Sequence, residues 1–346
     1  MVNYCEDYWQ DVRLVSEQIP NLDRLYGKSI LITGASGMIC SAAAEILLYL
    51  NKEQNGKIHI ILAGRNKERL QKRFYCFDEG KDYTFFHYDA TSSEPISIKT
   101  DFIIHGASNA DPGKFAKEPV ETMLANIVGL HALLKSASEN QTKRLLYISS
   151  SEVYGQKEEK RPYKEDDYGF VDILNPRASY PSSKRAAETL CSAYSAEYGL
   201  DTVMVRPGHI YGPTITNSDS RASAQFTRNA KAGRDIVMKS AGTQLRSYCY
   251  TMDCASAILT VLINGKCGEA YNISNSNSVV TIREMAEALA KAGNVNIVFE
   301  NPSDLEKKSY NLMENSSLDS SKIESLKWKA CFYIEQGAKK TINFYK

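Results

Sequence analysis

The chain carries KSILITGASGMIC at residues 28–40. The apolar run at 28–33 predicts a short buried strand, and the Ala- and Leu-rich stretch at 38–50 predicts a helix directly after it. Gly34 and Gly37 lie at the junction, where glycines permit a tight turn and a close approach of the backbone to a ligand. Glycine pairs also occur in ordinary turns, but the position at the first strand–helix junction favours a phosphate-binding turn at a helix N-terminus, as in dinucleotide-binding proteins.

Short apolar runs continue to alternate with helical patterns along the chain. Strands that alternate with helices predict βαβ units, and therefore an α/β fold with a doubly wound parallel sheet of the Rossmann type. The predicted strands are 28–33, 58–62, 83–88, 101–105, 144–148, 202–205 and 270–273, and the predicted helices are 38–50, 66–74, 119–138, 180–198, 253–263 and 281–292.

The rhythm of strands and helices changes from residue 206 onward, where polar and mixed segments follow. We therefore expect a smaller C-terminal substrate domain that covers the carboxyl edge of the sheet, where such folds bind ligands. The predicted division is an N-terminal extension at 1–26, an NAD(P)-binding Rossmann domain at 27–205 plus 247–274, and the substrate domain at 206–246 plus 275–346.

Charge and composition exclude several classes of protein. The 42 basic and 41 acidic residues leave a net charge of +1, which argues against a nucleic-acid partner bound through a general positive field. No apolar run is long enough to span a membrane, and the polar N-terminus does not read as a signal peptide. The eight cysteines and five histidines show no zinc-binding spacing. We expect a cytoplasmic protein with reduced thiols and without a metal site.

Tyr180 and Lys184 lie four residues apart on a predicted helix and therefore share a face. An ordinary tyrosine has a pKa of about 10, and a nearby ammonium group in a cleft can lower it by favouring the phenolate. A hydroxyl from Ser150 could hold a substrate oxygen while the phenolate takes its proton. This set predicts oxidation of an alcohol with transfer of a hydride to a nicotinamide. The alternative is an amphipathic helix with an incidental pair.

The second predicted strand ends at Arg65 without the acidic residue that usually binds the ribose 2′-hydroxyl of NAD. Arg65 could instead meet the 2′-phosphate of NADP, or it could be a solvated side chain at the start of a helix. Asp89 follows the third strand and is placed to reach the adenine. Cys40 stands where a third glycine would allow close packing of helix on strand, and a thiol is small enough to replace it.

Further motifs follow in a fixed order: HGAS at 105–108, Asn126, SSEVYG at 150–155, RPGHIYGP at 206–213 and RSYCY at 246–250. With the glycine turn and the Tyr–Lys pair, they make the chain resemble an extended short-chain dehydrogenase/reductase of the nucleotide-sugar epimerase/dehydratase family over roughly residues 28–335. Within that family the chain looks most like UDP-glucuronate decarboxylases (UDP-xylose synthases).

The resemblance implies a nucleotide-sugar enzyme that oxidises C4 of the sugar and recycles a tightly bound NAD, as decarboxylases and 4-epimerases do. Tyr180 would be the base, Lys184 would lower its pKa, and Ser150 would hold the sugar hydroxyl. Ser151 and Glu152 would face the C5–C6 end of the sugar. The implied cofactor contacts are Gly34, Ser36, Gly37, Met38, Ile39, Arg65, Asp89, Ala107, Ser108, Asn126, Tyr180 and Lys184, and the implied substrate contacts are Arg206, His209, Arg221 and Arg246.

The motifs leave alternatives open. Ser151 argues against a 4,6-dehydratase, where an Asp acid is expected, and Glu152 argues mildly against a 4-epimerase. His209, where decarboxylases tend to have Asn, leaves open an NADPH-dependent 4-ketoreductase, which Arg65 also favours. Cys40 suggests a non-catalytic NAD(P)-sensing protein as a further alternative. The resemblance also implies a homodimer that forms a four-helix bundle from the helices at 115–138 and 180–198.

Overall fold

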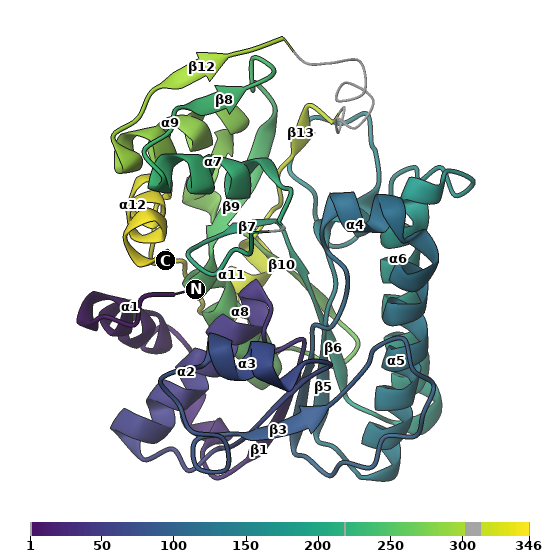
Figure 1. The fold of residues 1–346 in the computed structure, drawn as a ribbon. Helices are drawn as coiled ribbons and strands as arrows, with labels where there is room; N and C mark the ends of the chain where they lie inside the picture. Colours follow the sequence, from purple (N-terminus) through teal and green to yellow (C-terminus); the bar gives the residue numbers. More distant parts are fainter. Residues whose placement is uncertain (1, 218, 302–312, 346) are drawn as a thin grey trace.

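The computed structural model describes residues 2–345 except 218 and 302–312. Seven strands form a central sheet in the order β10-β6-β5-β4-β1-β2-β3, and every neighbouring pair is parallel (Figure 1). The predicted Rossmann-type sheet is confirmed. Its strands are β1 Ser29–Thr33, β2 His59–Gly64, β3 Thr84–His87, β4 Phe102–His105, β5 Arg144–Ile148, β6 Thr202–Pro207 and β10 Ala270–Ile273.

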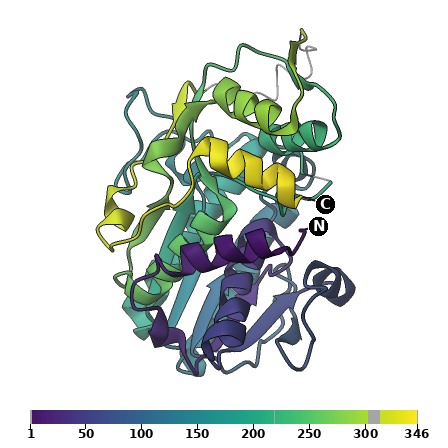
Figure 2. The same ribbon diagram turned by 90° about the vertical axis from the view of Figure 1, so that its left-hand side faces the viewer.

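Helices cover both faces of this sheet (Figures 1 and 2). Alternate strand residues point to opposite faces. Ile30, Ile32 and their equivalents in the neighbouring strands pack against α2 (Met38–Gln54) and α8 (Thr251–Asn264). Leu31 and its equivalents pack against α5 (Pro119–Glu139) and α6 (Ser179–Tyr198). Because the strands are buried on both faces, they are apolar throughout, as the sequence indicated.

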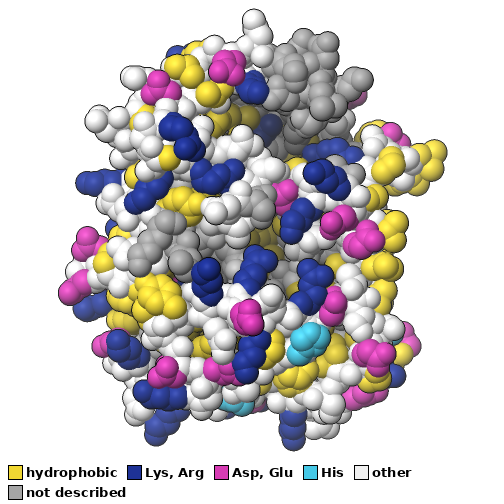
Figure 3. Space-filling model, in the orientation of Figure 1, with side chains coloured by type: hydrophobic (Ala, Val, Ile, Leu, Met, Phe, Trp, Pro, Cys, Tyr) yellow, Lys and Arg dark blue, Asp and Glu magenta, His cyan; other side chains and the backbone are white. Residues whose placement is uncertain are grey.

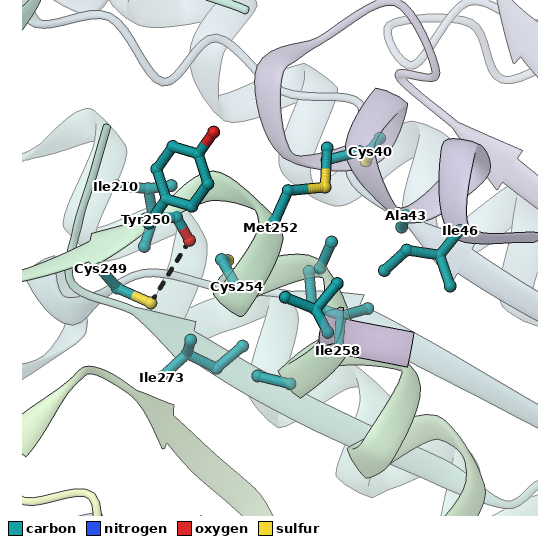
Figure 4. Packing of buried hydrophobic residues seen from close by; sticks show 14 of the residues in the cluster. Cys40, Ala43, Ile46, Ile210, Cys249, Tyr250, Met252, Cys254, Ile258 and Ile273 are labelled. Atoms are coloured by element: carbon teal, nitrogen blue, oxygen red, sulfur yellow. Dashed lines mark hydrogen bonds between the residues drawn. The ribbon is translucent and has the colours of Figure 1, made fainter. Parts of the chain in front are cut away.

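The core between α2 and α8 is built from small and flexible side chains (Figure 4). Cys40 and Ala43 of α2 lie near Met252 and Ile258 of α8 in this cluster. The small residues allow the two helices to lie close together over the sheet. All eight cysteines of the chain are free thiols.

Smaller sheets and further helices follow the central sheet. A four-stranded sheet contains β7 (His209–Tyr211), β9 (Leu245–Tyr250), β11 (Val279–Thr281) and β13 (Asn315–Ser316), and β8 (Ile236–Met238) pairs with β12 (Ile297–Phe299). The domain division stays a prediction, although its second Rossmann range, 247–274, begins inside β9 of the smaller sheet. The remaining helices are α1 Glu6–Ser16, α3 Lys67–Arg73, α4 Pro112–Lys117, α7 Ala222–Lys231, α9 Ile282–Gly293, α11 Ser321–Glu324 and α12 Ile334–Phe344, with 3-10 turns η1 Leu22–Leu25, η2 Ser151–Tyr154, η3 Pro176–Ala178 and η4 Ser276–Ser278.

None of the helices in the described part of the chain is long and apolar enough to cross a membrane.

The N-terminal residues are attached to α2 through the buried carboxylate of Glu45. Glu45 of α2 is fully buried, and it accepts hydrogen bonds of 2.5 Å from the hydroxyls of both Tyr4 and Tyr8. Arg73 at the end of α3 completes the cluster with an ion pair of 2.6 Å to the same carboxylate. A carboxylate removed from water must be paired and hydrogen-bonded, so the extension supplies two of the groups that Glu45 needs.

We expect Tyr8→Phe to lower the free energy of unfolding by about 1.5–3 kcal/mol, because it removes a hydrogen bond to a buried charged group. Tyr26→Phe is the matched control, since the Tyr26 hydroxyl bonds to Gln54 at an exposed site. Urea unfolding of both variants measures the difference. Equal losses in the two variants would show that Glu45 does not need the hydroxyl of the extension.

Candidate active site at the carboxyl edge of the sheet

The turn after β1 lies against the end of β4. Gly34 has a φ of +67°, and a Cβ placed there would be 2.8 Å from the Gly106 carbonyl oxygen and 2.9 Å from the Ala107 nitrogen. Both the backbone angle and the lack of space therefore require glycine. The Gly37 nitrogen closes the turn with a 2.8 Å bond to the Gly34 oxygen.

Cys40 takes the place of the expected third glycine without loosening the packing. Its thiol is buried, and a Cβ at Gly106 would overlap the Cys40 Sγ atom. Glycine on β4's side of the contact thus makes room for a thiol on the helix side. Burial raises the pKa of Cys40 to about 12, so the group is a protonated, unreactive thiol at neutral pH. The tight packing of Cys40 removes the reason for expecting loose cofactor binding, which was the feature that suggested a non-catalytic NAD(P)-sensing protein.

The N-terminus of α2 fits the diphosphate of a dinucleotide. Gly37 is its N-cap, and no side chain caps the helix, so its first N–H groups are available to an anion. Met38 and Ile39 form the first turn, and Ser36 lies just before it, all three partly exposed. Glycine at both turn positions leaves room for close approach of a phosphate group.

Arg65 and Asp89 lie together where β2 and β3 end. Asp89 accepts bonds of 2.9 and 2.8 Å from the backbone nitrogen and the hydroxyl of Thr91. Burial alone would raise the Asp89 pKa, but the Thr91 hydrogen bonds and the nearby Arg65 charge lower it. Asp89 is therefore a fixed carboxylate at the predicted adenosine end, and Arg65 is an exposed cation beside it. Whether Arg65 meets a 2′-phosphate stays a prediction.

The segment after β4 offers one unused hydroxyl. Ala107 donates its backbone N–H to the Thr33 hydroxyl at 3.3 Å, which ties this segment to β1. The hydroxyl of Ser108 is buried and has no hydrogen-bond partner among the residues that the structure describes. A buried polar group without a partner is costly, so Ser108 is a good candidate for contact with a bound cofactor.

Asn126 is fully buried between α5 and α6. Its amide nitrogen donates to the Thr122 carbonyl at 2.9 Å and to the Ser183 hydroxyl at 3.1 Å, and its oxygen accepts from the Tyr147 hydroxyl at 3.1 Å. These bonds hold the two helices together directly beside the Tyr180 turn. Its predicted contact with the cofactor remains a prediction.

The structure brings Ser150, Tyr180 and Lys184 together. Ser150 ends the segment after β5, and its hydrogen bond to Tyr180 favours the phenolate. Lys184 donates to the Ile148 carbonyl at 2.7 Å, and its Nζ lies 5.7 Å from the centre of the Tyr180 ring. The three groups thus lie together at the carboxyl end of β5, and the catalytic roles assigned to them stay predictions.

The protein chain by itself does not lower the Tyr180 pKa, and a lowered pKa with the cofactor bound stays a prediction. Burial raises the pKa of Tyr180 to about 12, which outweighs the Ser150 hydrogen bond. Burial also lowers the pKa of Lys184 to about 7, against the opposing charge of Glu188. Desolvation disfavours both charged forms, and the amine points to a carbonyl, not to the phenol. A lowered phenol pKa therefore needs additional charge from bound molecules.

A second cluster adjoins Tyr180 and contains two residues that the sequence reading missed. The ring of Phe115 on α4 stacks on Tyr180 with centroids 5.0 Å apart and planes at 9°. The Arg177 guanidinium lies 5.4 Å from the Phe115 ring centre and 3.6 Å from the carboxylate of Glu152. Arg177 stands three residues before Tyr180, which is the spacing of one helical turn and the available sequence signal.

Glu152 lies in the 3-10 turn η2 that Ser151 begins. Burial raises the pKa of Glu152, and the charge and hydrogen bond of Arg177 oppose this rise. Its charge also acts on the phenol of Tyr180. Glu152 therefore lies close enough to the predicted base to act on it, and the substrate contacts of Glu152 and Ser151 stay predictions.

Three of the four predicted substrate contacts converge. Burial lowers the pKa of His209 to about 3, and the charges of Arg246 and Arg221 act in the same direction. The Nδ1 atom of His209 is buried without a hydrogen-bond partner among the described residues. Arg221 forms a two-bond pair with Asp219 at 2.9 and 2.5 Å, and its charge reaches Tyr180. A neutral imidazole and two guanidinium groups therefore lie in one region of the protein.

Arg206 is not among these groups, and the substrate role predicted for it is corrected. Its side chain is buried and forms bonds of 3.0 and 2.6 Å to Glu188. It also donates to the Tyr154 hydroxyl at 3.0 Å and to the Glu165 carbonyl at 2.7 Å. All of its donor nitrogens are thus engaged inside the protein, and Arg206 joins β6 to α6 as a structural ion pair.

These features define a dinucleotide-binding α/β protein with a Tyr–Lys site at a sheet edge. Residues 30–274 match the model of the NAD dependent epimerase/dehydratase family. The chain belongs to this family, and the predicted family is confirmed.

Several known proteins resemble the chain over most of its length. UDP-glucuronic acid decarboxylase 6 of Arabidopsis thaliana is 30% identical over 264 residues, which are 75% of this chain and 73% of the relative. dTDP-D-glucose 4,6-dehydratase of Homo sapiens is 26% identical over 328 residues, 93% of this chain and 91% of the relative. Among solved structures, UDP-glucuronic acid 4-epimerase from Bacillus cereus shares the fold with a TM-score of 0.75 and 20% identity, over 91% of this chain and 98% of that one.

The lowered pKa of Lys184 predicts a specific dependence of stability on pH. Between about 7 and the ordinary value of 10.5, the unfolded chain holds this proton and the folded chain does not. Stability therefore rises with pH through this window. We expect the wild-type protein to gain stability relative to Lys184→Met as pH increases from 7 to 10, measured by urea unfolding. Parallel pH profiles would show that Lys184 keeps its ordinary pKa in the folded protein.

Proposed function

We propose that this chain is an NAD-dependent nucleotide-sugar enzyme that oxidises C4 of a sugar and releases CO₂ from its C6 carboxylate, with UDP-glucuronate as substrate. The main support is the half-buried carboxylate of Glu152, which pairs with Arg177 at 3.6 Å and acts on Tyr180. Relatives named UDP-glucuronic acid decarboxylase, among them three that are 30% identical, agree with this choice.

The cofactor proposal starts from the glycine turn. Gly34, Ser36 and Gly37 with the first turn of α2 would hold the diphosphate, and Ser108 would supply a hydroxyl. The family is named for its dependence on NAD, and solved structures that share the fold, including a dTDP-glucose 4,6-dehydratase from Bacillus anthracis, contain NAD. When bound, NAD supplies the acceptor for the hydrogen that leaves C4.

In this proposal Tyr180 removes the proton of the C4 hydroxyl. Ser150 would hold the hydroxyl oxygen while the phenolate of Tyr180 accepts its proton. Lys184 is the cation that can favour this phenolate, provided that it keeps its own proton. With a pKa of about 7, Lys184 is partly protonated at neutral pH. A nearby negative charge would raise this pKa and so increase the protonated fraction.

Oxidation at C4 places the C6 carboxylate β to a ketone, so the carbon–carbon bond can break with its electrons held in an enolate. The products are CO₂ and an enolate that needs a proton at C5. Glu152, whose burial raises its pKa, would supply that proton with the help of Ser151. His209, Arg221 and Arg246 would bind the diphosphate or the sugar.

The alternative is an NADPH-dependent 4-ketoreductase, which the exposed Arg65 beside Asp89 favours. The two proposals differ in the fate of the cofactor. A decarboxylase regenerates its NAD in each cycle and should retain it through purification, whereas a reductase consumes NADPH and should release the product. Mass spectrometry of the nucleotide released from the purified protein distinguishes them.

Incubation with UDP-glucuronate tests the reaction directly. We expect the wild-type protein to remove CO₂ from this substrate, detected by mass spectrometry. Tyr180→Phe should lower kcat by about two to four orders of magnitude, because it removes the proton acceptor. Glu152→Gln should lower formation of the C5-protonated product more than it lowers reduction of NAD, because the proton at C5 is needed only after C4 is oxidised and CO₂ has left.

Two exposed residues provide the controls for these variants. Tyr198→Phe alters a tyrosine at the far end of α6, and Glu158→Gln alters an exposed carboxylate near Glu152 in sequence. Both should keep wild-type rates. A protein that purifies without NAD, prefers NADPH and leaves UDP-glucuronate unchanged would contradict the decarboxylase proposal.

We also propose a cytoplasmic homodimer in which α5 and α6 of two copies form a four-helix bundle. The two helices lie side by side on the outer face of the sheet (Figure 1). Val120, Met123 and Leu124 of α5 are exposed despite being apolar, with Val120 at 61%. A groove of about 180 Å³ beside them, between α5 and residues 173–179, extends this apolar surface. Such a surface is typical of an interface.

Met123→Asp tests the dimer. We expect this variant to be a monomer by light scattering, because a carboxylate buried in the helix interface would lack a partner. Val298→Asp on β12 places the same charge at another partly exposed apolar site and should leave the dimer intact. A monomeric wild-type protein would contradict the proposal.

A further inference from the structure

A second hollow lies next to the glycine turn, outside the Tyr180 site. It has a volume of about 190 Å³ and lies between α3 and residues 214–217. Ser36 of the glycine turn and Arg69, Lys72 and Arg73 of α3 line one side. We call it the α3 cavity. Several Lys and Arg side chains lie around the middle of the face that Figure 3 shows.

The α3 cavity carries an uncompensated positive charge. Arg73 is neutralised by Glu45, with which it forms a 2.6 Å ion pair. Arg69 and Lys72 form no ion pair with any residue in the described ranges, and both are exposed. Two cations at one small hollow repel each other, and a bound anion would offset this repulsion.

The opposite side of the cavity offers neutral hydrogen-bonding groups. Thr214, Thr216 and Asn217 lie in its lining, where the Thr214 hydroxyl donates to the Met38 carbonyl at 3.3 Å. The amide oxygen of Asn217 accepts a 3.1 Å bond from the Tyr345 hydroxyl, which fixes the orientation of the amide. Cations on one side and neutral polar groups on the other suit an oxyanion with several acceptor oxygens.

The volume limits the ligand. Pockets for drug-sized molecules measure about 300–1,000 Å³, so a cavity of about 190 Å³ takes a small group and not a whole nucleotide. Phosphate has the size and the charge that the lining requires. We propose that the α3 cavity binds a phosphate group through Arg69 and Lys72.

Two sources of this phosphate group share the same chemistry. Ser36 belongs both to the cavity and to the turn that we propose for the dinucleotide, so a phosphate on the adenosine ribose of NADP is one source. Inorganic phosphate is the other. The NADP source rests on the alternative function, the NADPH-dependent 4-ketoreductase, whereas binding of inorganic phosphate requires neither function.

Isothermal titration calorimetry on the full chain separates the two sources. NAD, NADP and inorganic phosphate are titrated in turn into wild-type protein and into Arg69→Gln, Lys72→Gln and the double variant. Lys52→Gln, which removes an exposed cation from the far end of α2, is the matched charge control. Arg65→Gln separates the cavity from the cation at the end of β2.

We expect the double variant to weaken binding of the phosphate-bearing ligand by about tenfold, because each exposed cation contributes modestly. The affinity for NAD should stay unchanged in the same variant, and Lys52→Gln should match the wild type. A preference for NADP that is lost in the double variant supports the nucleotide source. Binding of inorganic phosphate that is lost in the same way supports the free ion.

Other outcomes overturn the proposal. The first is that neither NADP nor inorganic phosphate binds the wild-type protein more tightly than it binds the double variant. The second is that phosphate binding survives in the double variant. The third is that binding is lost only in Arg65→Gln. Failure of the proposed function is recognised separately, because it appears as loss of NAD binding or of CO₂ release.

Discussion

The close contact between the turn after β1 and the end of β4 is the constraint on which the site depends. In the strand order of this sheet, chain direction from β1 runs outward to β2 and β3 on one side and to β4 and β5 on the other. Beyond their contact, the connections after β1 and β4 lead in opposite directions along the sheet, and open α/β sheets bind ligands at such a point. Gly34 can lie against Gly106 and Ala107 only because it lacks a Cβ atom. The start of α2, and so the proposed diphosphate site, is fixed by this contact.

The contact between Cys40 and Gly106 shows that close packing here depends on the combined size of the two residues, and not on a glycine at position 40. A thiol on the helix is accommodated because the strand side provides a glycine. The sequence shows both residues, but only the structure shows that they meet. Burial keeps the thiol protonated, so Cys40, at the position where a third glycine was expected, acts in packing and not as a reactive group.

The sequence was sufficient for the central sheet because both faces are buried, and seven apolar runs bounded by turns have few other arrangements. It also located the Ser150, Tyr180 and Lys184 set, since the Tyr–Lys spacing is local to one helix. It failed where the partner is distant. Arg206 lies in a motif that suggests ligand binding, yet Glu188 and Tyr154 occupy its donors.

Contacts formed between separate segments were likewise not predictable. The stack of Phe115 on Tyr180 joins α4 to α6, and no periodicity relates the two residues. The buried charge of Glu45 is completed by Tyr4 and Tyr8 from the N-terminal extension. A polar leader in the sequence gives no indication that its tyrosines reach a carboxylate in a central helix.

The three arginines around the proposed substrate site differ in whether a carboxylate pairs with them, and this difference points to Arg246 as the partner for an anionic substrate. Arg177 is paired with Glu152, and Arg221 is paired with Asp219, so neither adds much net charge. Arg246 is buried, and its partners in the described part of the chain are the carbonyls of Leu245 and Met313, which carry no opposite charge. Burial lowers the pKa of Arg246, which is the cost of an uncompensated cation in a site of low polarity. A diphosphate beside Arg246 would neutralise its charge. Arg177 and Arg221, held in place by their carboxylates, would then orient the sugar.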